Sequence, residues 1–319
     1  MIIISERGHE TWASWQLVYE WEDEMVKSFN GSNLYLSKDI VIKGHHVLRY
    51  LARKTGININ TLFLHGKDTF RFCMSPELEG SEWNWPNLSV DIIDFYLKKE
   101  QLHNFYRCYS KVKSLYVSSR EVYEFLLANN PEREVRHLPL TLPDKYRITR
   151  ETNFAKKFDL VMLGRQSNVL VDYLHEYEKN HQIYYIYNTG KKGENFNYIT
   201  NKGEVIPEVL NREDYINLLR KSKVILYSTA GMDSVRKTNG FHQVTPKFLE
   251  AIASGCHVIS QFLDNPDTEF FELNRMSQRV KCYKDFEKAM DYALSTPVDM
   301  QQYSQYLEKH YTSTYKNLM

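Results

Sequence analysis

Short apolar runs alternate along this chain with longer stretches whose apolar residues recur at helical spacing. The run Ile2–Ile4 opens the chain, and after a polar loop a helical pattern extends from Thr11 to Phe29. The same reading predicts further strands and helices in the first half, at 40–43, 45–55, 61–64, 90–95, 115–117, 118–129 and 135–138. Strands that alternate with helices favour an α/β fold with parallel sheets.

The pattern breaks between about Pro139 and Lys157, where two prolines stand in a charged stretch with few apolar residues. A second series of strands and helices then begins, at 158–163, 169–179, 183–187, 212–221, 224–227, 286–294 and 301–315. The chain of 319 residues is long enough for two cores. We therefore expect two Rossmann-like domains, at residues 1–145 and 156–300.

The most informative stretch of the second series is 244–260. Thr245 suits the N-cap of a helix, Pro246 its first position, and Gly255 the left-handed residue that ends it; a strand starts at Val258. A helix start presents free N–H groups and a partial positive charge, which attract anions.

Two charged side chains add to this helix start. Lys247 places a cation in the first turn, where the macrodipole disfavours one, and Glu250 lies three residues later on the same face. A cation for phosphate and a carboxylate for a sugar hydroxyl suit a nucleotide-sugar. The alternative is an ordinary helix whose Lys247 and Glu250 form a solvated pair.

The run from Thr245 through Ile259 resembles the donor-binding helix of GT-B glycosyltransferases, particularly the retaining family-four group. The resemblance implies two facing Rossmann-like domains, the first binding the acceptor and the second the donor, with 301–319 crossing back onto the first. It implies that Glu250 holds the ribose, and that Thr245, Pro246, Lys247 and Phe248 meet the donor diphosphate.

Strand-end residues of the second domain extend this site. Arg165 follows the first strand of that domain, where ligands of open parallel sheets bind, and its planar guanidinium suits phosphate oxygens. The resemblance implies that Arg165 neutralises the diphosphate leaving group. Tyr187 and Asn188 follow a second strand and can meet the base, although both are also ordinary turn residues.

The sequence departs from the retaining family at one position. That family carries two glutamates eight residues apart, but His242 stands eight residues before Glu250. Either His242 takes the missing glutamate's place against the donor sugar, or the loop is rearranged. Retaining and inverting chemistry therefore both stay open.

An inverting enzyme needs a general base on the acceptor side. The loop after the first strand supplies Glu6, His9 and Glu10 as candidates, and ordinary solvated side chains are the alternative. Asp94, or its neighbour Asp91, is the second choice because a carboxylate within an apolar strand calls for a partner.

Composition narrows the class of protein. The formal net charge is +1 and no basic run is interleaved with aromatic residues, which argues against a nucleic-acid binder. The four cysteines lack metal-ligand spacing, and neither a signal peptide nor a long apolar run is present. We expect a cytoplasmic protein, which a lipid-linked acceptor would bring to the inner face of the membrane.

The sequence thus predicts a glycosyltransferase that moves a sugar from a UDP- or GDP-linked donor to a glycan or lipid-linked glycan acceptor. By the resemblance, the context is bacterial surface polysaccharide synthesis. No cofactor or metal is expected, since the chain lacks an Asp-x-Asp triplet and the cations can neutralise the diphosphate. The alternatives are a GT-B nucleotide-sugar epimerase and a non-catalytic sugar-nucleotide-binding or partner protein.

Overall fold

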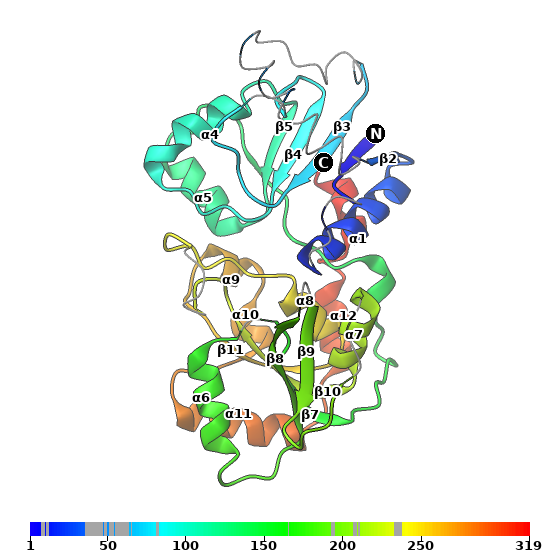
Figure 1. The fold of residues 1–319 in the computed structure, drawn as a ribbon, viewed down its shortest axis with the longest axis vertical. Helices are drawn as coiled ribbons and strands as arrows, with labels where there is room; N and C mark the ends of the chain where they lie inside the picture. Colours follow the sequence, from blue (N-terminus) through cyan, green and yellow to red (C-terminus); the bar gives the residue numbers. More distant parts are fainter. Residues whose placement is uncertain are drawn as a thin grey trace. The chain divides into compact units, whose positions relative to one another are not determined.

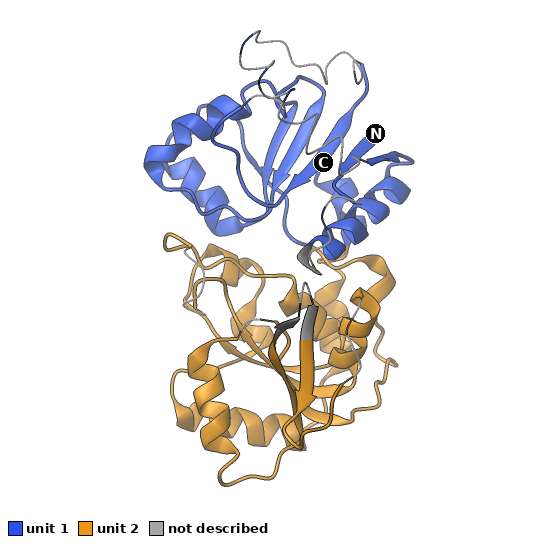
Figure 2. Ribbon diagram, viewed as in Figure 1, with its two compact units in different colours: residues 1–140, 312–319 blue, residues 141–311 orange. Residues whose placement is uncertain are grey.

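The structure is a computed structural model, and it divides into two compact units, residues 1–140 with 312–319 and residues 141–311 (Figure 2). It describes residues 1–7, 10, 13–35, 47, 50, 54, 64, 66–80, 83–164, 166–192, 195–206, 209, 211–232 and 238–319. The predicted strand at 40–43 lies outside these residues, and the predicted elements at 45–55 and 61–64 lie almost wholly outside them.

The first unit contains a six-stranded parallel sheet in the order β2-β1-β3-β4-β5-β6 (Figure 1). Its strands are β1 (Ile2–Ser5), β2 (Ser32–Tyr35), β3 (Thr69–Cys73), β4 (Leu88–Ile92), β5 (Ser114–Val117) and β6 (Arg136–His137). The described helices of this unit are α1 (Ala13–Ser28), η2 (Lys99–Gln101), α4 (Leu102–Cys108), α5 (Arg120–Ala128) and the C-terminal η4 (Thr312–Asn317). The inner strands β1, β3, β4 and β5 are mostly buried, as the interior of a parallel sheet requires, whereas the edge strand β2 is largely exposed.

The second unit contains another six-stranded sheet, in the order β12-β11-β10-β7-β8-β9, with β9 antiparallel at the edge. Its strands are β7 (Phe158–Val161), β8 (Tyr185–Lys192), β9 (Asn195–Thr200), β10 (Ser222–Ser228), β11 (His257–Gln261) and β12 (Gln278–Arg279). Its helices are η3 (Asp144–Tyr146), α6 (Asn168–Tyr177), α7 (Arg212–Arg220), α8 (Lys247–Ala253), α9 (Pro266–Phe270), α10 (Leu273–Met276), α11 (Tyr283–Ser295) and α12 (Met300–Leu307).

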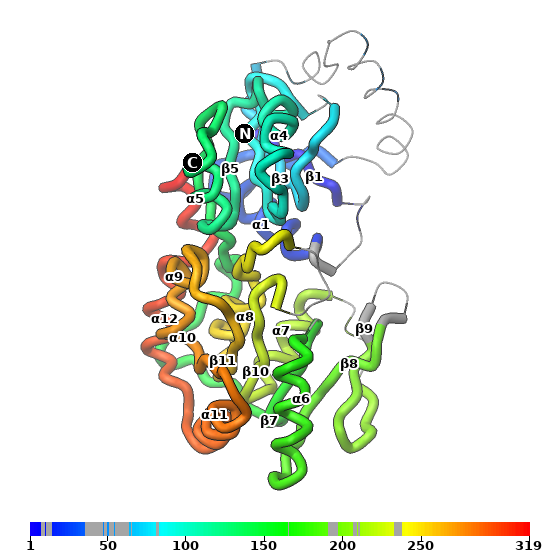
Figure 3. Tube along the Cα trace, turned by 90° about the vertical axis from the view of Figure 1, so that its left-hand side faces the viewer, coloured from blue at the N-terminus to red at the C-terminus, as the bar shows by residue number. Residues whose placement is uncertain are grey.

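Helices cover the second sheet on both faces (Figure 3). The helices α6 and α11 share one apolar core with alternate residues of β7, β10 and β11. On the other face α7 and α8 pack against β10, and α8 also contacts β11 and α12. The helix α8 is buried almost all round, from Phe248 through Ala253, which fixes its position against the sheet.

Two helix ends differ from the sequence prediction. The cap of α5 is Ser119, whose hydroxyl accepts from Val122 N, whereas Ser118 donates to Asp91. The predicted helix at 301–315 ends at Leu307, and the C-terminal eight residues belong to the first unit. Within that unit Tyr315 donates to the Pro139 carbonyl at 3.2 Å.

Candidate functional site

Two buried side chains accept hydrogen bonds from the backbone of the segment that leads into α8. The N–H of Val244 donates to Asp267 at 2.7 Å, and the N–H of Thr245 donates to the Tyr227 hydroxyl at 3.0 Å. Asp267 and Tyr227 are both fully buried. The backbone before α8 is therefore fixed by β10 and α9, which leaves the start of the helix preorganised for a ligand.

The helix itself begins at Lys247, one residue later than predicted. Pro246 stands as the N-cap with helical dihedral angles, and Thr245 contributes a carbonyl that accepts from Phe248 N at 3.1 Å. Gly255 takes a φ of +62°, so the predicted left-handed end of the helix is confirmed. Lys247 is half-buried and Phe248 is fully buried.

Removing the Tyr227 hydroxyl tests how the segment is held. Tyr227→Phe leaves the ring against Phe248 but deprives the Thr245 N–H of its acceptor. An orphaned buried N–H costs about 1–3 kcal/mol, and because Thr245 is only half-buried we expect the free energy of unfolding to fall by an amount near the lower end of that range. Urea unfolding followed by circular dichroism measures it. Tyr292→Phe is the matched control, because Tyr292 is 52% exposed, and an equal loss in both variants contradicts the prediction.

Glu250 is buried and its ionic partner is Arg212, not Lys247. Its side chain is 3% exposed, and its Oε1 accepts from Arg212 at 2.6 Å. The hydroxyl of Tyr215 also hydrogen-bonds Glu250, and desolvation raises the pKa of Tyr215 well above its usual 10. The interpretation of a solvated Lys247–Glu250 pair is therefore wrong.

Sequence reasoning missed Arg212 as part of this site. Arg212 is the first residue of α7, directly after the cap Asn211, whose side chain accepts from Asp214 N. A cation in the first turn of a helix opposes the macrodipole, which is the same signal that marks Lys247. That signal was available at Arg212, but its partner lies 38 residues away along the chain.

His242 lies against the loop at the carboxyl end of β10. Its Nδ1 is 3.1 Å from the Ala230 carbonyl, so this nitrogen carries the proton of the bond. Gly231 has a φ of +86°, and a Cβ there would lie 2.7 Å from Thr238 Oγ1 and 3.2 Å from His242 Nδ1. Only glycine fits this close approach, which sets the position of the histidine.

The carboxyl ends of β7, β8 and β11 are tied together by side chains. Asn188 donates to the Gly164 carbonyl at 3.0 Å, and Ser167 donates to Gln261 at 2.6 Å. Tyr187 is half-buried beside them. Arg165 lies outside the described residues. Asn188 thus holds the Gly164 carbonyl just after β7, and its predicted role at the base stays a prediction.

The candidate bases of the first unit have different surroundings. Glu6 is buried and accepts from Arg71 at 2.6 Å, and the Arg71 guanidinium stacks on Trp83 at 3.8 Å. Glu10 is half-buried, and its carbonyl accepts from Tyr19. Asp94 follows the end of β4, half-buried, within 3.4 Å of the Tyr96 hydroxyl. His9 lies outside the described residues.

Two further carboxyl groups of the first unit are fully buried. Asp91 accepts from Ser118 at 2.9 Å, and burial raises its pKa to about 8. Glu22, which sequence reasoning missed, accepts from Ser5 at 2.6 Å, and burial raises its pKa to about 7. Burial therefore favours the protonated form of Asp91 at neutral pH, which argues against a role as general base.

Comparisons with known proteins bear on the fold. No family model matches the chain, and the search of curated proteins finds no match. Two solved structures are similar over nearly the whole length. One is an alpha-glucosyltransferase in complex with UDP and a DNA 13-mer, with a TM-score of 0.51, 10% identity, and coverage of 98% of this chain and 96% of that one. The other is AviGT4, a glycosyltransferase involved in avilamycin A biosynthesis, with a TM-score of 0.51, 9% identity, and coverage of 98% and 94%.

Both are glycosyltransferases of the GT-B type, and this chain has the GT-B fold: two Rossmann-like units, each with a mostly parallel sheet. The fold prediction is confirmed. At this identity the likeness concerns the fold alone. The assignment of individual residues therefore depends on the geometry above.

Proposed function

We propose that this protein is a glycosyltransferase whose second unit binds a UDP- or GDP-linked sugar. The observation that carries the proposal is the start of α8, held by Tyr227 and Asp267, with Lys247 in its first turn and Glu250 fixed by Arg212 behind it. Ligands of parallel α/β sheets bind at such strand-end segments. A cation and N–H groups there would stabilise the charge that develops on a departing diphosphate.

In the proposed reaction the bond between sugar C1 and the diphosphate breaks, and its electron pair goes to the diphosphate oxygen. The acceptor hydroxyl forms the new bond to C1 and gives up its proton. Lys247 and Arg165 would neutralise the leaving group without a metal. In an inverting reaction Glu6, His9, Glu10 or Asp94 would accept the proton. In a retaining reaction the departing diphosphate oxygen would accept it, and His242 would stand against the donor sugar.

The resemblance of the α8 segment to family-four glycosyltransferases supports the proposal that the reaction belongs to bacterial surface polysaccharide synthesis. The acceptor would then be a glycan or a lipid-linked glycan, and the protein would work in the cytoplasm at the membrane surface. Within the described part of the chain, no helix is long and apolar enough to cross a membrane.

A screen of thermal stability against UDP, GDP, CMP and dTDP tests the proposal and selects the donor class. We expect stabilisation by UDP or GDP, and transfer from the matching nucleotide-sugar that persists in the presence of a chelator. An epimerase would convert the donor to an isomer without any acceptor. Binding with neither transfer nor isomerisation would leave a sugar-nucleotide-binding protein, and no stabilisation by any nucleotide would overturn the proposal.

The contribution of Lys247 can be measured separately. Lys247→Ala removes a half-buried cation at the start of α8, so we expect UDP or GDP affinity to fall about tenfold, because charge-assisted bonds contribute about 1.5–3 kcal/mol. Calorimetry measures the affinity. Lys284→Ala, at an exposed position on α11, is the control. Equal affinities in the two variants would place the diphosphate elsewhere.

A further inference from the structure

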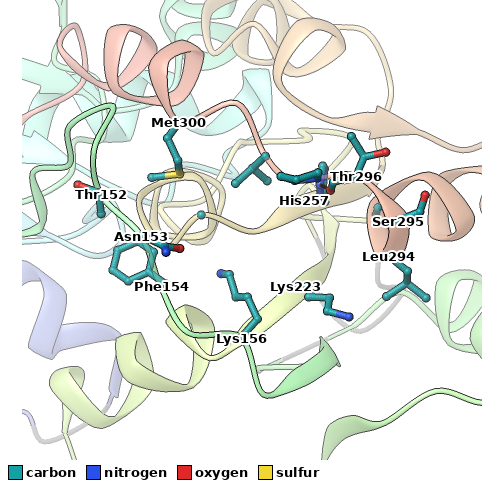
Figure 4. A pocket seen from close by; sticks show the side chains of 14 residues that line it. Thr152, Asn153, Phe154, Lys156, Lys223, His257, Leu294, Ser295, Thr296 and Met300 are labelled. Carbon is teal, nitrogen blue, oxygen red and sulfur yellow. Dashed lines mark hydrogen bonds between the residues drawn. The ribbon is translucent and has the colours of Figure 1, made fainter.

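A cavity in the second unit lies away from the proposed donor site. Its volume is about 310 Å³, and its walls come from the segment before β7, the starts of β10 and β11, and the connection between α11 and α12 (Figure 4). Because α8 runs from the carboxyl edge of the sheet to Gly255, and Gly255 lines this cavity, the two sites lie at opposite edges of the sheet.

One cation within the cavity has no counter-ion. Lys156 donates from Nζ to the Ser254 carbonyl at 2.8 Å, and no described carboxylate lies within ion-pair distance of it. Lys156 is half-buried, and burial lowers the pKa of its ammonium. A desolvated charge of this kind is costly unless an anion approaches it.

The other basic residues of the cavity are already compensated. Lys223 forms an ion pair with Asp159 at 2.9 Å, and its ammonium points away from Lys156 in Figure 4. His257 lies 2.7 Å from the Thr296 carbonyl through Nε2, and burial lowers its pKa, which favours the neutral ring. None of the lining residues is acidic. The cavity therefore carries one net positive charge, at Lys156.

The remaining wall is largely apolar. Phe154 and Met300 flank the Lys156 ammonium, and the other apolar lining residues are Ala293, Leu294, Pro297 and Val298. Gly255 forms part of the surface, where a Cβ would lie 3.2 Å from Phe154 and 3.3 Å from Met300. The cavity is near the lower end of the volumes of ligand pockets, which are about 300–1,000 Å³.

From the cavity and its single uncompensated cation we propose that this site binds a small organic monocarboxylate with an apolar or aromatic body. A lysine is a point charge that matches one carboxylate, whereas the two charges of a phosphate monoester would leave one without a partner here. The body of the ligand would lie against Phe154, Leu294 and Met300. Nothing in this inference depends on the sugar-transfer proposal, because the two sites share no residue.

Calorimetry on the full chain with benzoate and 3-phenylpropionate, at millimolar concentrations, tests the site. We expect both to bind, and benzamide, the neutral analogue of benzoate, to bind at least about tenfold more weakly, since one lost charge-assisted bond is worth about that much. Phenyl phosphate should also bind more weakly than benzoate. Absence of carboxylate binding, or equal binding of benzamide, overturns the proposal, and tighter phenyl phosphate binding overturns the choice of a carboxylate.

Variants assign the binding to Lys156. Lys156→Met should abolish the preference for benzoate over benzamide, and Lys156→Arg should retain it. Lys157→Met is the matched control, because Lys157 is the exposed neighbour and does not line the cavity. UDP or GDP affinity should be the same in all four proteins. Benzoate binding that survives in Lys156→Met would place the ligand elsewhere.

Discussion

Glu250→Gln is expected to lower UDP or GDP affinity by about tenfold or more while the protein stays folded. Glutamine keeps the shape of the side chain and can still accept from Arg212. It loses the negative charge that strengthens bonds to the ribose hydroxyls and that compensates the Arg212 guanidinium. Calorimetry measures the affinity, and Glu213→Gln on the exposed side of α7 is the control.

Glu250 can act on the nucleotide directly or through Arg212. A nucleotide that lacks the ribose hydroxyls can distinguish these two roles. The wild type should bind the 2′,3′-dideoxy nucleotide more weakly than the ribonucleotide. If Glu250 holds the ribose, that difference should vanish in Glu250→Gln. A difference that persists unchanged would show that Glu250 is a positioning residue for Arg212, and unaltered affinity for both nucleotides would remove Glu250 from the site.

The local chemistry around α8 was predictable because each signal is confined to neighbouring residues. Gly255 ends the helix in the left-handed region, and the buried strand after it follows directly from its apolar side chains. Asn211 caps α7 for the same reason, since a side-chain cap reaches only two or three residues ahead. Such signals fix the order of elements, and the order of elements predicted the fold.

The features that the sequence did not predict depend on contacts between residues that lie far apart along the chain. The strand β3 was not predicted, because Arg71 interrupts its apolar pattern. Its partner Glu6 lies 65 residues away. Likewise the predicted last helix stops at Leu307, because the chain there turns to pair with Leu142, whose N–H donates to the His310 carbonyl at 2.7 Å. No local pattern reports such a pairing.

The candidate functional site also combines local features that the sequence predicted with distant partners that it did not. The segment from Thr245 to Glu250 was found from its own residues, but Tyr227, Asp267 and Arg212 hold it from three other elements. In the first unit, Glu6 was predicted as an available base and lies in an ion pair. Asp91 was treated as an ionised carboxylate, but burial raises its pKa to about 8, which favours the protonated form at neutral pH. Burial is a property of the whole fold, and the sequence does not state it.

Asp91 should make the first unit less stable as the pH rises, which is the largest titration effect expected here. Its pKa is about 8 in the folded protein and near 3.8 when unfolded, so between these values only the folded state holds the proton. The free energy of unfolding therefore falls with rising pH across this window. The total corresponds to roughly 6 kcal/mol, of which about 1 kcal/mol is lost between pH 7 and 9.

Above pH 7, Asp91 contributes the largest part of the expected loss among the described residues. Burial lowers the pKa of His137 and His310 to about 4, so these residues make stability rise with pH, but only up to the usual histidine value of 6.5. Glu22 acts in the same direction as Asp91, but its pKa is about 7, so its effect is small above about pH 8. Burial raises the pKa of the Cys73 thiol from 9 to about 12, which adds a smaller loss as the pH approaches 9.

Asp91→Asn should therefore remove most of the loss of stability between pH 7 and 9. Asparagine resembles the protonated acid in shape and can still accept from Ser118. All five tryptophans lie between residues 12 and 85, so urea unfolding followed by their fluorescence reports on the first unit, which contains Asp91. Glu22→Gln is the control, because most of its effect should fall below pH 7 and it should remove only a minor part of the loss between pH 7 and 9. If Asp91→Asn loses as much stability as the wild type from pH 7 to 9, Asp91 is already ionised at neutral pH and regains its place among the candidate bases.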